Sequence, residues 1–259
     1  MVDTDRPRAL GITSAVTAGA VVLSARGVLD DTTYLWLRDK IIHASLEEPR
    51  AVIVDVTALT APAASSWLAF TSARWHVASW PRVPIILVCG DADVRAAIAR
   101  SGIDARVAVY DTVDRAMGAL PAPGARRHRA RAQLTAVHSL GRSRELVAGW
   151  LTAWSRADLI PVATVVATAF VENVLQHTDS SPRLRLESDG SAITVVVEDS
   201  SRTHASRHET TGSRPPSGLA VVSALCRTWG NTPTPTGKAV WAVIGPENRL
   251  KPAVTVAAN

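Results

Sequence analysis

Cysteine is scarce in this chain. Two cysteines occur in 259 residues, and Cys89 and Cys226 lie far apart without CxxC or Cys/His ligand spacing, which argues against a disulfide framework and a structural zinc site. No apolar run approaches the roughly 18 residues that span a bilayer, and the first residues lead into no signal-peptide core. Intrinsic disorder is excluded by 47% hydrophobic against 20% charged residues. We therefore expect a soluble, cytoplasmic protein of one large domain or two ordinary ones.

Acidic residues are in slight deficit, which gives a formal net charge of +5. Nearly all of the excess lies in residues 121–132, which carry four arginines and no acid. No aromatic side chain alternates with these arginines to stack on a base, so direct nucleic-acid binding is disfavoured. A short Pro/Gly/Arg-rich run between two periodic segments is typical of a solvated linker. We interpret residues 9–120 as one domain, 121–132 as the linker, 133–246 as a second domain and 247–259 as a tail.

The first domain alternates strand-like and helical patterns. The run 51–56 is continuous and β-branched, which is typical of a strand buried on both faces. Similar runs at 21–25, 83–88 and 107–110 are separated by helical spacing around residues 35–42, 67–75, 94–98 and 113–120. Strands that alternate with helices predict an α/β fold with right-handed crossovers.

Three segments of this domain resemble a known family. They are Gly27–Asp30, the run 52–60, and Ser65-Ser66 at the start of a helix. Together they resemble the STAS domain of anti-sigma-factor antagonists, over about residues 9–120. The resemblance implies a regulatory role in which the domain binds partner proteins of a sigma-factor switch.

The resemblance also implies a phosphorylation site, from which this chain departs. In the family an Asp-Ser-Ser-Gly run opens the helix, and the serine after the aspartate takes a phosphate from a partner kinase. Without a gap, the residues at these four positions are Ala63, Ala64, Ser65 and Ser66. Alanine has no hydroxyl, so the usual acceptor is absent. A one-residue slip makes Ser65 the candidate phosphoacceptor, whereas Ser65 and Ser66 are also ordinary N-cap residues.

The second domain follows a different order. A helical segment comes first, and a second helix, which begins near Pro161, carries the adjacent polar residues Glu172 and Asn173 in an otherwise apolar run. Two strands, a polar loop, a helix and a closing strand follow, at residues 183–187, 193–199, 200–217, 218–227 and 239–244. This order predicts an α+β sandwich, with helices on one face of a mixed sheet.

The polar residues of this domain resemble a second family in their order. Glu172-Asn173 lie on a helix, Asp199 ends a strand, Gly218-Leu219 open a helix, and Gly237-Lys238 precede the last strand. This order is similar to the GHKL (HATPase) ATP-binding domain of anti-sigma-factor serine kinases, over about residues 133–246. The resemblance implies ATP and Mg²⁺ as cofactors, with Leu219, Gly237 and Lys238 among the nucleotide-binding residues.

The resemblance gives several of these residues separate roles. Asn173 would hold Mg²⁺, for which an amide oxygen is a hard ligand. Glu172 would activate a serine hydroxyl as a general base, and Asp199 would accept a hydrogen bond from the adenine amine. Gly218 would leave the backbone N–H groups of a helix start facing a phosphate. Taken singly, these residues are also explained by an exposed helix edge, a turn and a helix-start glycine.

Two departures separate this domain from the family pattern. The family motif Asp-x-Gly-x-Gly, whose glycines let the backbone approach the base, is here Asp-Ser-Ser-Arg-Thr from Asp199 to Thr203. Pro216 stands where the phosphate loop usually has a second glycine. The segment 202–217 is rich in Ser, Thr, Arg and Pro, which fits either a lid over nucleotide or a flexible surface loop.

Two functions follow from these observations. In the first, the chain is an ATP-dependent anti-sigma-type serine kinase that regulates transcription in a stress response, fused to a STAS-like domain without its usual phosphoacceptor. In the second, both domains are non-catalytic partner-switching modules, and nucleotide is structural or absent. Glu172 favours the first function, whereas Ala64 and the missing glycines favour the second. A contact between the two domains and a homodimer remain open alternatives.

Overall fold

The computed structural model describes residues 10–120, 128–135, 138–200 and 218–250. The chain divides into two compact units, Met1–Pro123 and Gly124–Asn259, and each is described by itself. The predicted lid at 202–217, Pro216 included, lies outside the described residues.

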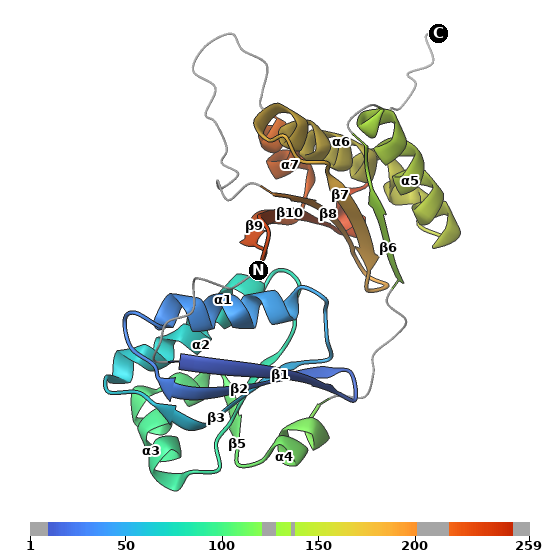
Figure 1. The fold of residues 1–259 in the computed structure, drawn as a ribbon. Helices are drawn as coiled ribbons and strands as arrows, with labels where there is room; N and C mark the ends of the chain where they lie inside the picture. The colour runs from blue at the N-terminus through green and yellow to red at the C-terminus, as the bar shows by residue number, and fades with distance from the viewer. Residues whose placement is uncertain (1–9, 121–127, 136–137, 201–217, 251–259) are drawn as a thin grey trace, which may run out of the picture. The chain divides into compact units, whose positions relative to one another are not determined.

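The N-terminal unit is a five-stranded sheet with helices on both faces (Figure 1). The strand order is β1-β2-β3-β4-β5; β1 is antiparallel to β2, and the remaining pairs are parallel. The strands are β1 (Leu10–Thr17), β2 (Ala20–Val28), β3 (Val52–Thr60), β4 (Ile85–Val88) and β5 (Ala108–Tyr110). The helices are α1 (Tyr34–Ser45), η1 (Ala64–Trp67), α2 (Leu68–Val77), α3 (Ala92–Ser101), η2 (Ile103–Ala105) and α4 (Val113–Gly118).

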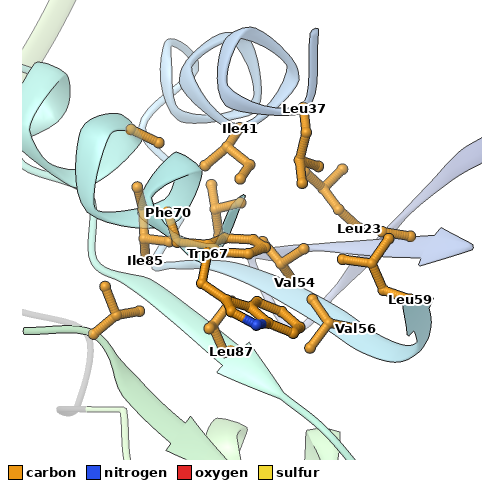
Figure 2. Close-up of a cluster of buried hydrophobic side chains, with 14 of the residues drawn as sticks. Leu23, Leu37, Ile41, Val54, Val56, Leu59, Trp67, Phe70, Ile85 and Leu87 are labelled. Carbon is orange, nitrogen blue, oxygen red and sulfur yellow. The ribbon is translucent and has the colours of Figure 1, made fainter. Parts of the chain in front are cut away.

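The central strand β3 has a core on each of its faces. Val52, Val54 and Val56 point toward α1, α2 and α3, whereas Ala51 and Ile53 belong to a smaller cluster with α4. Figure 2 shows the larger core, in which Trp67 and Phe70 lie against the sheet. Because both faces of β3 are covered, apolar residues occupy both alternating positions of the run 51–56, and Asp55 is its one charged residue.

The C-terminal unit is a five-stranded sheet in the order β6-β7-β8-β10-β9. Its strands are β6 (His128–Gln133), β7 (Arg183–Ser188), β8 (Ile193–Asp199), β9 (Thr228–Pro233) and β10 (Lys238–Ile244). Its helices are α5 (Ser139–Ala153), η3 (Ala157–Leu159), α6 (Ile160–His177), α7 (Gly218–Leu225) and η4 (Pro246–Asn248). Figure 1 shows α5, α6 and α7 together on one side of the sheet.

Two expectations about this unit need correction. The sheet is not mixed, because all four strand pairings among the described residues are antiparallel. The linker does not extend to residue 132, because β6 begins at His128. In β6 the arginines Arg129 and Arg131 alternate with the half-buried Ala130, so these two of the four arginines lie on one face of an edge strand.

One helix, residues 157–177, is apolar and long enough to cross a membrane by length and composition, with a mean hydropathy of 1.5 over its best window. Half of that window is buried inside the unit. Val162, Val166 and Phe170 lie in the core against the sheet. This segment therefore serves as the core helix of the C-terminal unit in the structure.

Candidate functional site

The first candidate site is the junction between β3 and α2. The chain leaves β3 at Thr60 and enters η1, which packs against α3. Ala63 is the N-cap of η1, with an extended backbone (φ −113°, ψ 139°) and no side-chain cap, because alanine carries no acceptor atom. The prediction that Ser65 or Ser66 caps this helix is therefore wrong.

The two serines of η1 differ in their access to solvent. Ala64 and Ser65 are exposed, whereas Ser66 is buried with 3% of its surface accessible. The Ser66 hydroxyl has no hydrogen-bond partner in the described part of the chain. Ser65 is therefore the one side-chain hydroxyl of η1 that is exposed to solvent, and Ala64, at the predicted acceptor position, carries none.

Next to η1, helix α2 presents apolar side chains to solvent. Trp75 is 78% exposed and Leu68 is 47% exposed, and a spacing of seven residues places them on the same helix face. The half-buried Ser72 lies between them. We call Leu68, Ser72 and Trp75 the α2 stripe. Sequence reasoning places Trp75 on a helix between residues 67 and 75 but does not indicate that it faces solvent.

The carboxyl ends of β3 and β4 are tied together beside this junction. The Thr57 hydroxyl accepts a hydrogen bond from the Gly90 N–H (2.9 Å), and the Asp55 carboxylate accepts one from the Thr57 N–H (3.0 Å). These bonds fix the strand ends from which the η1 segment departs. In sheets with parallel strands, binding segments lie at this edge.

The second candidate site lies in the C-terminal unit, at the facing ends of β8 and β10. Asp199 and Lys238 are directly opposite in the strand register. The Lys238 ammonium group lies 2.9 Å from Asp199 Oδ2 and donates a hydrogen bond to Oδ1 at 3.2 Å. The Asp199 side chain is 0% exposed and that of Lys238 is 7% exposed. The two residues form a buried ion pair.

Gly237 is placed against this ion pair by the backbone. A Cβ atom at Gly237 would lie 2.1 Å from the carbonyl oxygen of Asp199. Only glycine allows the backbone to pass this close. On the other side, the Ser200 N–H donates a hydrogen bond to the Ser180 hydroxyl at 3.2 Å, which ties the end of β8 to the segment after α6.

The remaining predicted residues meet at the contact between α6 and α7. A Cβ atom at Gly218 would lie 3.2 Å from the Cβ atom of Ala169 on α6, one helical turn before Asn173. Glu172 and Asn173 are half-buried, and Leu219 is buried in the core. The structure therefore brings Gly218 beside the helix of Glu172 and Asn173, and Gly237 and Lys238 beside Asp199.

These residues fit an ATP site only in part. The start of α7 packs on Ala169 of α6, the helix that carries Glu172 and Asn173, as a phosphate-side cluster requires. The Asp199 carboxylate, however, is occupied by Lys238, so an adenine amine would have to displace the ammonium group. Gly218 and Gly237 each have a packing role in the structure, between two helices and between two backbone segments.

Comparison with known proteins bears on the N-terminal unit. The family model of the STAS domain matches residues 12–116. This match supports a STAS domain in this part of the chain. The α/β prediction is thereby confirmed for this part of the chain, and so is its resemblance to a STAS domain. The GHKL assignment of the C-terminal unit stays a prediction.

Two solved structures are similar to this chain. An anti-sigma factor antagonist from Mycobacterium paratuberculosis is 19% identical, with a TM-score of 0.39, and the match covers 46% of this chain and 98% of the other. The anti-sigma factor antagonist SpoIIAA in its unphosphorylated form is 20% identical, with a TM-score of 0.34, and the match covers 41% and 93%. No curated protein matches the chain.

Proposed function

We propose that this chain is a partner-switching regulatory protein whose STAS domain binds another regulatory protein through η1 and the α2 stripe. The exposed pair Leu68 and Trp75 carries the proposal. Aromatic side chains on a surface are frequent anchors of protein–protein contacts, because they bury a large area at a low cost in conformational entropy. Ser65 lies exposed in η1, the segment that directly precedes this helix.

The partner that we propose is an anti-sigma-factor protein of the kinase type. With Ala64 at the usual acceptor position, the STAS domain stays in its unphosphorylated form and acts as a constitutive docking surface. Phosphorylation of an antagonist adds a charge of about −2 at such a surface, and this chain lacks the hydroxyl that would accept it in the family register.

The binding proposal is tested by titrating the full-length chain against purified anti-sigma-factor kinases from the same organism. We expect Trp75→Ala to weaken the complex by at least about tenfold. Leu35→Ala is the matched control, since Leu35 is 55% exposed on α1 and outside the α2 stripe. Binding that is equal in all three proteins, or absent throughout, contradicts the proposal.

Phosphorylation is tested on the same proteins. The full-length chain is incubated with Mg²⁺ and ATP, alone and with the partner kinase, and examined by mass spectrometry. We expect no stoichiometric phosphate on Ser65. Phosphate that is present on Ser65 of the chain alone, and lost in Glu172→Ala, would instead make the protein a self-contained phosphorylation switch.

We propose as a second candidate function that the C-terminal unit binds ATP with Mg²⁺. The contact between Gly218 and Ala169 supports it, because the first turn of α7 then lies beside the turn of α6 that precedes Asn173. A helix start favours a phosphate group, and an asparagine amide is a suitable Mg²⁺ ligand. Glu172 is the general base if the unit also transfers phosphate.

Calorimetry on the full-length chain, with and without Mg²⁺, tests this second function. Asn173→Ala should weaken binding of Mg²⁺-ATP more than binding of metal-free ATP. If Asn173→Ala weakens both forms of ATP equally, Asn173 is a packing residue and not a metal ligand. If the unmodified chain gives no binding heat with or without Mg²⁺, the proposed ATP binding is wrong. If ATP binds, phosphate transfer to a serine of a partner protein is measured next. Transfer that survives Glu172→Ala would show that Glu172 is not the general base.

A further inference from the structure

The outermost strand of the STAS domain has one unoccupied edge. β1 pairs along its whole length with β2, through eight consecutive residue pairs from Leu10↔Gly27 to Thr17↔Ala20. No strand lies on its other side within the described residues, because β1 ends the sheet (Figure 1). Residues 13–17 are exposed, and Val16 is 76% exposed. An unpaired strand edge is a template for a further strand.

This edge lacks the features that usually prevent strand pairing. The sequence of β1, LGITSAVT, contains no charged residue and no proline. Its register with β2 has no shift, whereas the β2–β3 pairing shifts between Ser24 and Arg26. The other edge strand, β5, is only three residues long, and short edge strands are poor templates. Of the two edges of this sheet, β1 is therefore the one suited to association.

We propose that β1 pairs with β1 of a second copy of this chain, antiparallel and across a two-fold axis perpendicular to the sheet. The strand is uncharged, so a second copy brings no like charges together. Under two-fold symmetry, both copies contribute the same residues to the interface. The edge has no charged side chain that would select an acidic or basic peptide. The composition of β1 therefore favours a second copy of the same uncharged strand.

The symmetry also determines which side chains meet. If the axis passes through residue 13 or 14, that residue lies opposite the same residue of the second copy. Every odd-numbered residue then faces an odd-numbered one, and every even-numbered residue an even-numbered one. Side chains on the same face of the sheet are therefore neighbours across the interface. Val16 then lies opposite Leu10 or Ile12 of the second copy. Leu10 and Ile12 belong to the face that packs on α1 and α2. The pairing would cover the exposed Val16 with apolar neighbours and extend the sheet from five strands to ten.

Sedimentation velocity of the full-length chain over a concentration series tests this inference. We expect a reversible dimer of modest affinity, since a strand edge buries less area than a typical stable interface. Ser14→Lys places two like charges near the axis and should weaken dimerisation by at least about tenfold. Leu35→Lys is the control, because it adds the same charge to an exposed position of α1 and should leave the dimer unchanged.

Cross-linking gives a second, independent measurement. Residues directly opposite across an antiparallel pair have Cα atoms about 4.5–5.5 Å apart, which lies within disulfide range. Thr13→Cys or Ser14→Cys should therefore form a disulfide-linked dimer on mild oxidation, and Leu35→Cys should not. The native thiols of Cys89 and Cys226 are both at least partly buried.

The inference is independent of the proposed partner-binding function, which uses α2. A chain that stays monomeric at every concentration overturns it. So does a dimer whose affinity is the same in Ser14→Lys and in Leu35→Lys, because that interface would lie elsewhere. Circular dichroism and thermal melting of each variant establish that a loss of dimer is not a loss of fold.

Discussion

At the scale of single residues, the ion pair of Asp199 and Lys238 has the largest predicted effect. Lys238→Met removes the ammonium group and leaves the Asp199 carboxylate buried without its cation, which should cost about 3–5 kcal/mol of unfolding free energy. Replacing both partners, with Asp199→Leu and Lys238→Met together, should recover most of this loss. Urea denaturation monitored by circular dichroism measures each value.

The surface ion pair of Arg142 and Glu145 is the matched control for this prediction. Its side chains are 60% and 69% exposed, and exposed pairs contribute at most about 1 kcal/mol. Arg142→Ala should therefore change the unfolding free energy little. If Lys238→Met lowers the unfolding free energy no more than Arg142→Ala does, the buried pair adds nothing to stability.

His43 on α1 gives the protein a dependence on acid pH. Burial lowers the pKa of His43 below its ordinary value, against the opposing effect of Asp39. As the pH falls below about 6.5, the unfolded chain takes up a proton that the folded state does not, so stability decreases. His43→Gln should flatten this part of the pH profile between about pH 7 and 5. An unchanged slope in urea titrations over that range would contradict the assignment.

Sequence reasoning groups Asp199 with Gly237 and Lys238 but does not predict how they are arranged. Asp199, Gly237 and Lys238 were selected because they follow the order of a known family, and the structure does place them together. The order cannot reveal the register between β8 and β10, and it is the register that sets the ammonium group against the carboxylate. Likewise, helical spacing located Trp75 on a helix, but the buried face depends on the tertiary packing of α2.

At the scale of elements, the strands that sequence reasoning missed are all edge strands. β1, β6 and β9 lie at sheet edges and are composed of small, polar or Gly- and Pro-containing sequences. An edge strand packs on fewer neighbours and needs no continuous apolar run. Central strands such as β3 are buried on both faces, and their sequences are accordingly easy to recognise.

Glycine has opposite effects in two elements of the C-terminal unit. In α5, a Cβ atom at Gly149 would meet no other atom within 4 Å, so Gly149→Ala should stabilise the unit by about 0.5–1 kcal/mol. At the start of β10, Gly237→Ala would press a methyl group on the backbone of Asp199 and Ser200, and should destabilise it by about 1–3 kcal/mol. Chemical denaturation of the two variants compares them. The same sign for both changes would contradict the geometry.

At the scale of the whole molecule, the two units have separate hydrophobic cores. One core joins β1–β4 to α1, α2 and α3, and the other joins the second sheet to α5, α6 and α7. Because each unit has its own core, each should fold alone. Expressed separately, residues 1–123 and 124–259 should each show a cooperative thermal transition and native-like circular dichroism. A fragment that remains unfolded would mean that its core depends on the other unit.

The exposure of Trp75 also determines how the protein can be observed. The chain has eight tryptophans, all within the described residues, and Trp75 alone among them is exposed. Trp67, Trp80 and Trp241 are each at most 5% accessible. An aqueous collisional quencher such as iodide will therefore act mainly on the fluorescence of one indole, and that indole lies on the α2 stripe. Loss of quenching on adding a candidate partner would report occupation of this surface without any label.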